Sequence, residues 1–231
     1  MALPKLNSPT YELEQPSTGE MIKYRPFLVR EQKQLMMAQE SEDETSIKNA
    51  MADVITQCTF EKINPLDIPL FDVELLFLRI RSKSVGENVD LNLLCPDDEK
   101  TKVTKTIKLE DVDVIMKEGH TNEIAITDKI KIVMRYPRLD DMLGADEIED
   151  IFKMVYRCVH EIHDGEKVYH KIDMSEKELV DFVDSLTSEQ FEKVTDFFDS
   201  MPKVQHVVEV TNPKTKKKGE VVIEGIQSFF G

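Results

Sequence analysis

A cysteine and three histidines in the C-terminal half of the chain are the residues best suited to metal chemistry. They are Cys158, His160, His163 and His170, and they fall within thirteen residues. On a helix, His160 and His163 share a face. Cys158 then points elsewhere, and His170 follows the break expected at Gly165. Because a zinc site needs four convergent ligands, the spacing favours histidines near a helix C-terminus, where the dipole stabilises positive charge.

A second cysteine indicates at most a lost metal site. The segment LLCPDD places Cys95 where a ribbon-type zinc knuckle has a cysteine. The partner cysteine is absent, and the matching hairpin near the C-terminus has none. We interpret the segment as a solvated turn, or as a ribbon that has lost its metal. The sequence therefore predicts no metal site and no cofactor.

Catalytic motifs are absent from the sequence. It has no GxSxG elbow, no HExxH and no GxxxxGK[ST] phosphate loop. The pairs Asp97/Asp98 and Asp140/Asp141 have the residue types of a general acid and base. Among 45 acidic residues such pairs arise by chance and usually face water. We therefore expect a protein that is not an enzyme.

Two features near the C-terminus are candidate partner-binding residues. The run KTKKK, residues 214–218, is a concentrated positive charge in a chain of net charge −15. Such a run is usually a solvated turn that discourages edge pairing, and the alternative is a docking site for an acidic partner. Two phenylalanines in the last three residues either return to the core or anchor a partner. The candidate residues are Lys214, Lys216, Lys217, Lys218, Phe229 and Phe230.

The composition is that of a folded protein with an uneven charge. The chain has 231 residues, of which 40% are hydrophobic and 32% charged. Residues 138–201 carry 18 acidic and 7 basic side chains, whereas residues 202–231 carry 5 basic and 3 acidic ones. An acidic surface repels phosphate backbones, so nucleic acid is not an expected partner.

Cysteine usage and hydropathy predict a cytosolic protein that contacts no membrane. The three cysteines are an odd number without a CxxC pair, which is typical of a reducing compartment. The first residues lack the charged start and apolar run of a signal peptide. No stretch approaches the ~18 uninterrupted apolar residues of a membrane span.

The N-terminal part of the sequence predicts a hairpin followed by helices. The segment QPSTGE separates two alternating runs, as in a hairpin. From Arg30 the period becomes helical, and the acidic residues 40–44 mark either a break between two helices or the first turn of the second. Residues 69–83 are the most hydrophobic and predict a buried helix, although the alternation of apolar residues in them leaves a strand open.

The remainder predicts an antiparallel sheet, acidic helices and a final hairpin. Five runs with period two follow one another too closely for parallel crossovers. Helical spacing then extends from Asp146 to Ile162, and two capping boxes, Ser175 with Glu178 and Thr187 with Gln190, open further amphipathic helices. The chain ends in a hairpin with a Pro/Lys/Gly tip. Three hairpins of similar outline suggest duplication, a hypothesis that turn chemistry alone can also explain.

These elements predict the α+β class: antiparallel β-hairpins and a small sheet with amphipathic helices. We expect three parts. Residues 1–137 form the N-terminal hairpin, helices and antiparallel strands; residues 138–201 form the acidic helical segment; residues 202–231 form the C-terminal hairpin.

Several segments together resemble a known family. They are the opening ALPKLNSPTYELEQPSTGEMIKYRPFLVREQKQLMMAQES, the segment FDVELLFLRIRSKSVGE and the LLCPDD block. They are similar to the baseplate hub subunit and hub assembly protein family of T-even-type contractile-tailed phages, especially those of marine cyanobacteria. The resemblance covers most of residues 2–136, weakens across the acidic helices and resumes in the closing hairpin.

The resemblance implies a role in building the baseplate hub and brings no catalytic residues. It implies other baseplate hub or tape-measure proteins as partners, and a homo-oligomer is compatible with it. It also implies the host cytoplasm as the site of assembly, with the virion tail baseplate as the destination of a retained subunit. Two alternatives stay open: a transient assembly chaperone that is absent from the virion, and a cell-wall hydrolase of the hub.

Overall fold

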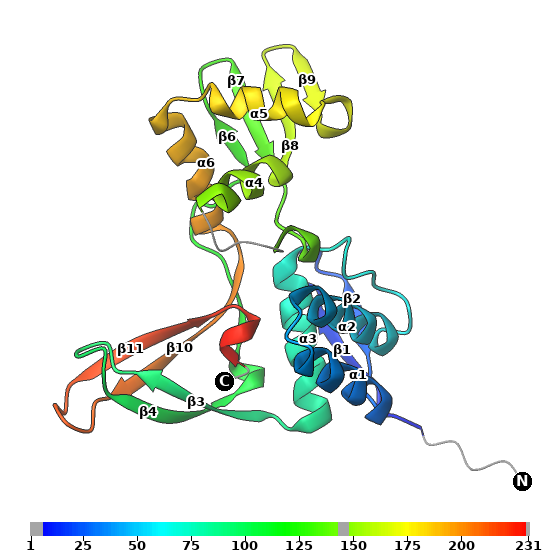
Figure 1. Cartoon of the computed structure of the whole chain (residues 1–231), viewed down its shortest axis with the longest axis vertical. Coiled ribbons are helices and arrows are strands. Elements are labelled where there is room, and N and C mark those ends of the chain that lie inside the picture. Colours follow the sequence, from blue (N-terminus) through cyan, green and yellow to red (C-terminus); the bar gives the residue numbers. More distant parts are fainter. Residues whose placement is uncertain (1–6, 143–147, 230–231) are drawn as a thin grey trace, which may run out of the picture. The chain divides into compact units, whose positions relative to one another are not determined.

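The computed structural model describes residues 7–142 and 148–229 (Figure 1). In these ranges the chain forms six α-helices and eleven strands, and every strand pair is antiparallel. The predicted α+β class is confirmed. Contacts divide the chain into two compact units. Unit 1 comprises residues 1–115 and 203–231, and unit 2 comprises residues 116–202.

Unit 1 begins with the predicted hairpin and continues into three helices. The elements are β1 (Tyr11–Glu14), β2 (Met21–Tyr24), α1 (Val29–Glu40), α2 (Glu44–Cys58) and α3 (Leu70–Val85). The acidic stretch 40–44 lies at the break between α1 and α2. There the Asp43 side chain accepts a hydrogen bond from the Ser46 amide at 2.8 Å, which satisfies one of the free N–H groups at the start of α2.

The central helix of unit 1 is α3, as predicted for residues 69–83. Most of its residues are buried, including Val73, Leu76 and Ile80, which are completely inaccessible. A helix enclosed on nearly every side has no polar stripe, which explains why its sequence also fits a strand. Two carboxyl groups are buried with it. Asp72 accepts hydrogen bonds from Gln15 and Ser17, and Glu74 accepts one from the Ile226 amide.

The other strands of unit 1 form two sheets. Strands β3 (Asn88–Leu94) and β4 (Lys102–Lys108) pair as a hairpin, and the second sheet has the order β11-β10-β5. The strands of that sheet are β5 (Asp113–Ile115), β10 (Lys203–Thr211) and β11 (Lys218–Glu224). The antiparallel pairing is as predicted, but the consecutive strands do not form one sheet, because β5 pairs with β10 from the end of the chain.

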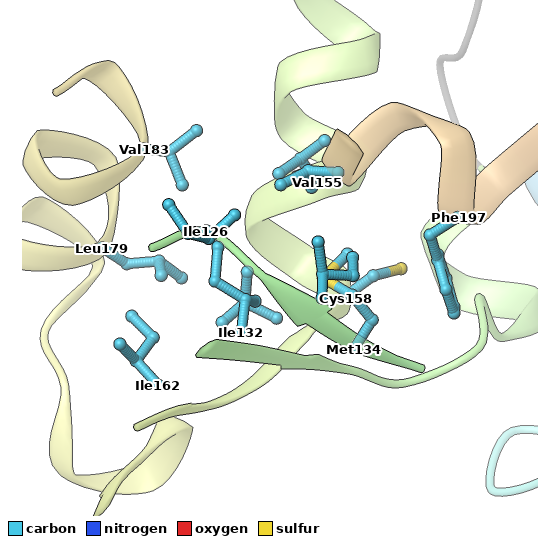
Figure 2. Close-up of a cluster of buried hydrophobic side chains, with 12 residues drawn as sticks. Ile126, Ile132, Met134, Val155, Cys158, Ile162, Leu179, Val183 and Phe197 are labelled. Atoms are coloured by element: carbon cyan, nitrogen blue, oxygen red, sulfur yellow. The ribbon is translucent and has the colours of Figure 1, made fainter. Parts of the chain in front are cut away.

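Unit 2 packs three helices on a four-stranded sheet of order β6-β7-β8-β9. The strands are β6 (Glu123–Ala125), β7 (Ile130–Met134), β8 (Val159–Asp164) and β9 (Lys167–His170), and the helices are α4 (Ile148–Cys158), α5 (Glu176–Asp184) and α6 (Ser188–Ser200). Ile132 and Met134 from the sheet meet Val155, Leu179 and Phe197 from the helices in one core (Figure 2). Both predicted capping boxes are present, at the starts of α5 and α6.

The helix predicted to continue to Ile162 ends earlier, at Cys158. The next residues form β8, in which Val159 pairs with Met134 and Ile162 with Ile132. A register shift at Val133/Met134 lets Val159 and Ile162 both face the core, so a strand reproduces the three-residue apolar spacing of a helix. His160 and His163 therefore lie on a strand and not on a helix.

Each unit fastens a hairpin to a helix with the same three groups, which we call the arginine lock. In unit 1 the Arg25 amide donates to the Cys58 carbonyl at 2.9 Å, and its guanidinium donates to Glu31 at 2.9 Å. In unit 2 the Arg135 amide donates to the Cys158 carbonyl at 2.7 Å, and its guanidinium donates to both oxygens of Asp141 at 2.7 and 3.1 Å.

The three parts predicted from the order of elements, residues 1–137, 138–201 and 202–231, remain a prediction. None of the helices in the described ranges is long and apolar enough to cross a membrane.

Candidate partner-binding surface

The lysine run occupies the turn between β10 and β11, residues 212–217, and the first residue of β11, Lys218. Asn212 shapes that turn through its backbone and its side chain. The Asn212 amide donates to the Lys217 carbonyl, and the Lys216 amide donates to the Asn212 carbonyl, both at 2.9 Å. The Asn212 side-chain oxygen accepts from the Lys214 amide at 2.8 Å. Lys216 adopts a φ of 63°, a conformation that few side-chain-bearing residues adopt.

The turn between β3 and β4, residues 95–101, begins in the same way and is one residue longer. The Cys95 amide donates to the Thr101 carbonyl at 2.8 Å, and the Glu99 amide donates to the Cys95 carbonyl at 2.9 Å. Glu99 also has a positive φ, of 51°. Each turn places a proline second and its positive-φ residue fifth, so Cys95 in one corresponds to Asn212 in the other. The resemblance between the two hairpins is therefore one of conformation as well as of composition.

The two turns are joined to each other through side chains. Asn212 donates to Asp97 at 2.9 Å and to Asp98 at 3.0 Å, and the Thr215 hydroxyl donates to Asp97 at 2.5 Å. Asn212 is only 1% exposed. A β-carbon on Gly219 would lie 2.5 Å from the ring of Pro96, so only glycine allows this approach. We call residues 95–101 and 212–219 the docked turns.

The aspartate pair that resembled a general acid and base holds the docked turns together. Hydrogen bonds from Thr215 and Asn212 hold the pKa of Asp97 below its ordinary value. The pKa of Asp98 is lowered further by the Thr101 hydroxyl and amide and by the Lys100 amide. Both carboxylates therefore stay ionised and serve as acceptors for neighbouring donors.

The docked turns bring further lysines beside the sequence run, together with the carboxylates of Asp97, Asp98 and Glu99. Lys100 from the first docked turn and Lys102 at the start of β4 join the four predicted lysines, and all six are exposed. In the described part of the chain, no salt bridge involves any of the six. Sequence reasoning missed Lys100 and Lys102 because more than a hundred residues separate the two turns. The similarity of the two hairpins was the available signal.

The predicted phenylalanines lie at the limit of the described chain. The backbone of Phe229 ends a short 3-10 helix, Ile226–Phe229, whereas the side chain of Phe229 and all of Phe230 lie outside the described residues. The Ile226 amide donates to Glu74 at 3.1 Å, which attaches the start of this segment to α3.

The three cysteines are free thiols inside the protein. Cys58, Cys95 and Cys158 are all buried and unbridged. Burial, followed by the charges of Asp97 and Asp98, raises the pKa of the Cys95 thiol.

The three histidines that were expected near a helix C-terminus lie instead on strands β8 and β9, around one carboxylate. His163 and His170 contact the carboxylate of Glu161 at 2.8 and 3.1 Å, and His160 lies 3.8 Å from it. No group of three or more histidine, cysteine or acidic side chains within the described ranges has an arrangement that could hold a metal ion.

Two further surface features are apolar. In unit 1, α1 exposes Val29, Met36 and Met37 along a shallow groove of about 380 Å³. In unit 2, a groove of about 540 Å³ runs beside α6 and is lined by Phe152, Leu186 and Phe191 among others.

Comparison with known proteins gives one family and one curated relative. Residues 8–231 match the family described as T4 bacteriophage base plate protein. The chain is 25% identical over 213 residues to the baseplate hub assembly protein gp26 of Enterobacteria phage T4, a match that covers 92% of this chain and 93% of that protein. No solved structure matches the chain.

Proposed function

This chain belongs to the T4 bacteriophage base plate protein family, and from that premise we propose that it is a non-enzymatic protein that assembles the baseplate hub through protein–protein contacts. The observation that carries the proposal is the extent of the match. It spans both units and nearly the whole length of a relative named as a baseplate hub assembly protein. A protein of this kind acts in the host cytoplasm while the tail is being built.

The docked turns are the proposed contact surface. Six exposed lysines without salt-bridge partners in the described chain concentrate positive charge on a protein of net charge −15. Charge complementarity at an interface sets the orientation of the partners and their rate of encounter. The fitting partner is therefore an acidic region of another hub or tape-measure protein. The hydrogen bonds between Asn212 and the two aspartates hold the two turns together in advance, so their backbone loses less entropy on binding.

Genetic complementation tests the proposal. Deletion of the gene should abolish baseplate hubs in electron micrographs of infected cells, and the wild-type chain supplied from a plasmid should restore them. Hubs that form normally without the chain would overturn the proposed function.

Charge reversal tests the contact surface separately. Changing Lys214, Lys216, Lys217 and Lys218 to Glu should reduce recovery of the partner by at least about tenfold in co-purification at low salt, because steering is lost. The matched control changes Lys62, Lys129, Lys167 and Lys177 to Glu, which alters net charge equally at exposed positions elsewhere. Equal loss in both variants would show a net-charge effect and remove the docked turns from the proposal.

A transient chaperone is the second candidate, favoured by the exposed methionines of α1. Met36 and Met37 are 55% and 61% exposed, and flexible methionine surfaces adapt to varied apolar partners. Quantitative mass spectrometry of purified virions separates the two roles. A fixed copy number per particle supports a retained subunit, and absence from particles that required the chain for assembly supports the chaperone.

A further inference from the structure

The groove in unit 2 is an apolar channel at the corner where α5 turns into α6, opposite a residue of α4. Its volume is about 540 Å³. The apolar lining residues are Phe152 from α4, Val183 from α5, Leu186 from the corner and Phe191 from α6. Val183 belongs to the buried core (Figure 2) and is 2% exposed, whereas the other lining residues are at least partly exposed. The groove is therefore an opening onto the edge of the core of unit 2.

Two aromatic rings form its most prominent wall. Phe152 and Phe191 stack with their centroids 4.8 Å apart and their planes at 20°. Phe152 nevertheless remains 37% exposed. A large aromatic side chain that is held by a stacking partner and still open to solvent can be buried at little further entropic cost. Such residues commonly carry most of the energy of an interface.

The remaining lining residues are acidic or hydroxylic. They are Asp184, Ser188, Glu192 and Thr195, and the groove has no lysine or arginine among its described lining residues. Asp184 accepts a hydrogen bond from the Tyr156 hydroxyl at 3.1 Å. Glu192 is exposed, and Asp196 extends the acidic charge along the same helix. A ligand that fills the groove must therefore offer apolar groups together with positive charge.

The groove runs along one face of helix α6. Ser188, Phe191, Glu192 and Thr195 recur at three- and four-residue spacing, so they follow one face of α6 for about two turns, or ~10 Å. A groove of this length, with apolar side chains from three elements and polar ones along α6, suits an amphipathic helix, whose anchors recur at the same spacing.

We infer that this groove binds an amphipathic helix of a partner protein that carries lysine or arginine beside its apolar face. The inference rests on the proposed function and deepens it, because it adds a second partner chemistry to the acidic one expected at the docked turns. The negative rim disfavours nucleic acid, whose phosphates it would repel.

A peptide-binding experiment on the full-length protein tests the groove independently of the phage. The probe is a fluorescein-labelled 18-residue helix in which leucine occupies one face and lysine the other. The matched probe has glutamate in place of lysine. Fluorescence anisotropy should show saturable binding of the lysine helix and at least about tenfold weaker binding of the glutamate helix. Equal binding of the two helices would overturn the charge argument.

Variants locate the binding. Phe152→Ala should weaken the lysine helix about tenfold or more, since it removes an aromatic anchor. The double variant Asp184→Lys/Glu192→Lys should weaken it to a similar extent. The control Asp128→Lys/Glu166→Lys changes net charge equally at exposed positions outside the groove and should bind like the wild type. Circular dichroism verifies that each variant is folded, and if Phe152→Ala unfolds, the charge pair decides the result.

A photo-crosslink tests the inference in infected cells. A benzoylphenylalanine at Ser188 should capture a segment of a baseplate protein that is helical and basic beside its apolar face. Capture of an acidic segment, or of a second copy of this chain, would overturn the inference. Because the peptide experiment does not depend on hub assembly, its failure with intact complementation removes the groove alone. Its success without complementation removes the proposed function alone.

Discussion

Unit 1 and unit 2 close their hairpins with the same lock and then continue differently. In both, an arginine directly follows the second strand, and the carboxylate that it binds comes six residues later. In both, that carboxylate also accepts an amide three residues before it, Leu28 in unit 1 and Arg138 in unit 2. After the cysteine that completes the lock, unit 1 leads on to helix α3, whereas unit 2 enters strand β8 at once.

The difference shows that the arginine lock fixes how the hairpin joins the end of the helix. It does not determine whether a helix or a strand follows. In unit 2, the bond from Arg135 to the Cys158 carbonyl continues into the β7–β8 pairing at Met134 and Val159. In unit 1, Cys58 is followed by Thr59, whose hydroxyl bonds back into α2, and the chain turns away. The duplication hypothesis, which concerned three hairpins, therefore gains a different basis: a repeated hairpin, arginine, carboxylate and helix end.

The locks also differ in burial. Glu31 is completely buried and is bound by both Arg25 and Arg30, whereas the Asp141 side chain retains slight exposure and one bidentate arginine. Burial alone would raise the pKa of Glu31, but hydrogen bonds from the two arginines and the Leu28 amide outweigh it and hold the pKa below its ordinary value. Asp141 shows the same balance, with Arg135 and the Arg138 amide lowering its pKa against burial.

The largest expected effect comes from removing the arginines. Arg25→Met leaves the Glu31 carboxylate buried without its main partner and should lower the free energy of unfolding of unit 1 by about 3–5 kcal/mol. Arg135→Met should cost less, about 2–3 kcal/mol, because Asp141 is nearer to solvent. Hydrogen exchange resolved by residue measures each unit separately. A larger loss for Arg135→Met would reverse the order that burial predicts.

A buried carboxyl without an arginine should behave in the opposite way. Burial raises the pKa of Glu74 to about 7, although the Ile226 amide acts against this. Because the folded pKa lies above the unfolded value, the stability that protonated Glu74 contributes is lost as pH rises from about 4.5 to 7. The wild type should therefore lose about 2–3 kcal/mol relative to Glu74→Gln between pH 5 and pH 8. Urea unfolding at the two pH values measures this, and parallel pH profiles would contradict it.

The carboxylates of the two arginine locks, Glu31 and Asp141, should change stability with pH in the opposite direction to Glu74. Since the pKa values of Glu31 and Asp141 are lowered, their stabilisation is present above the unfolded pKa and is lost only as pH falls through the folded one.

Exchanging the two acids sharpens the comparison at smaller cost. Glu31→Asp shortens the side chain that reaches Arg25, and Asp141→Glu lengthens the one that binds Arg135. Each should cost about 1–2 kcal/mol, because charge is kept while hydrogen-bond geometry is lost. Thermal unfolding followed by circular dichroism measures both. A substitution without effect would show that its unit tolerates either acid, and that the lock is looser there.

The smallest expected effect is on the rates at which the lock cysteines, Cys58 and Cys158, are alkylated. Burial raises the pKa of Cys58 to about 11 and that of Cys158 to about 12, so neither thiol should react with iodoacetamide at pH 8 unless its unit opens. Arg25→Met should accelerate alkylation of Cys58 alone, and Arg135→Met that of Cys158 alone. Mass spectrometry of timed samples gives both rates. Joint acceleration by either variant would show that the units open together.

The sequence by itself determined the local elements. The hairpin at QPSTGE, the helix at residues 69–83 and both capping boxes follow from turn residues, apolar spacing and side-chain caps, which act within a few positions. The charge separation between the acidic helices and the lysine turn is likewise a property of composition. The family resemblance was also carried by local segments.

The tertiary structure alone decided which distant segments meet. Asn212 meets Asp97 and Asp98 across more than a hundred residues, and β5 leaves its neighbours to pair with β10. The end of α4 at Cys158 depends on β7, because Val159 and Ile162 fit a helical stripe as well as a bulged strand. Long-range pairing of this kind depends on which partner each apolar face and each buried polar group contacts. Local sequence patterns do not specify these distant partners.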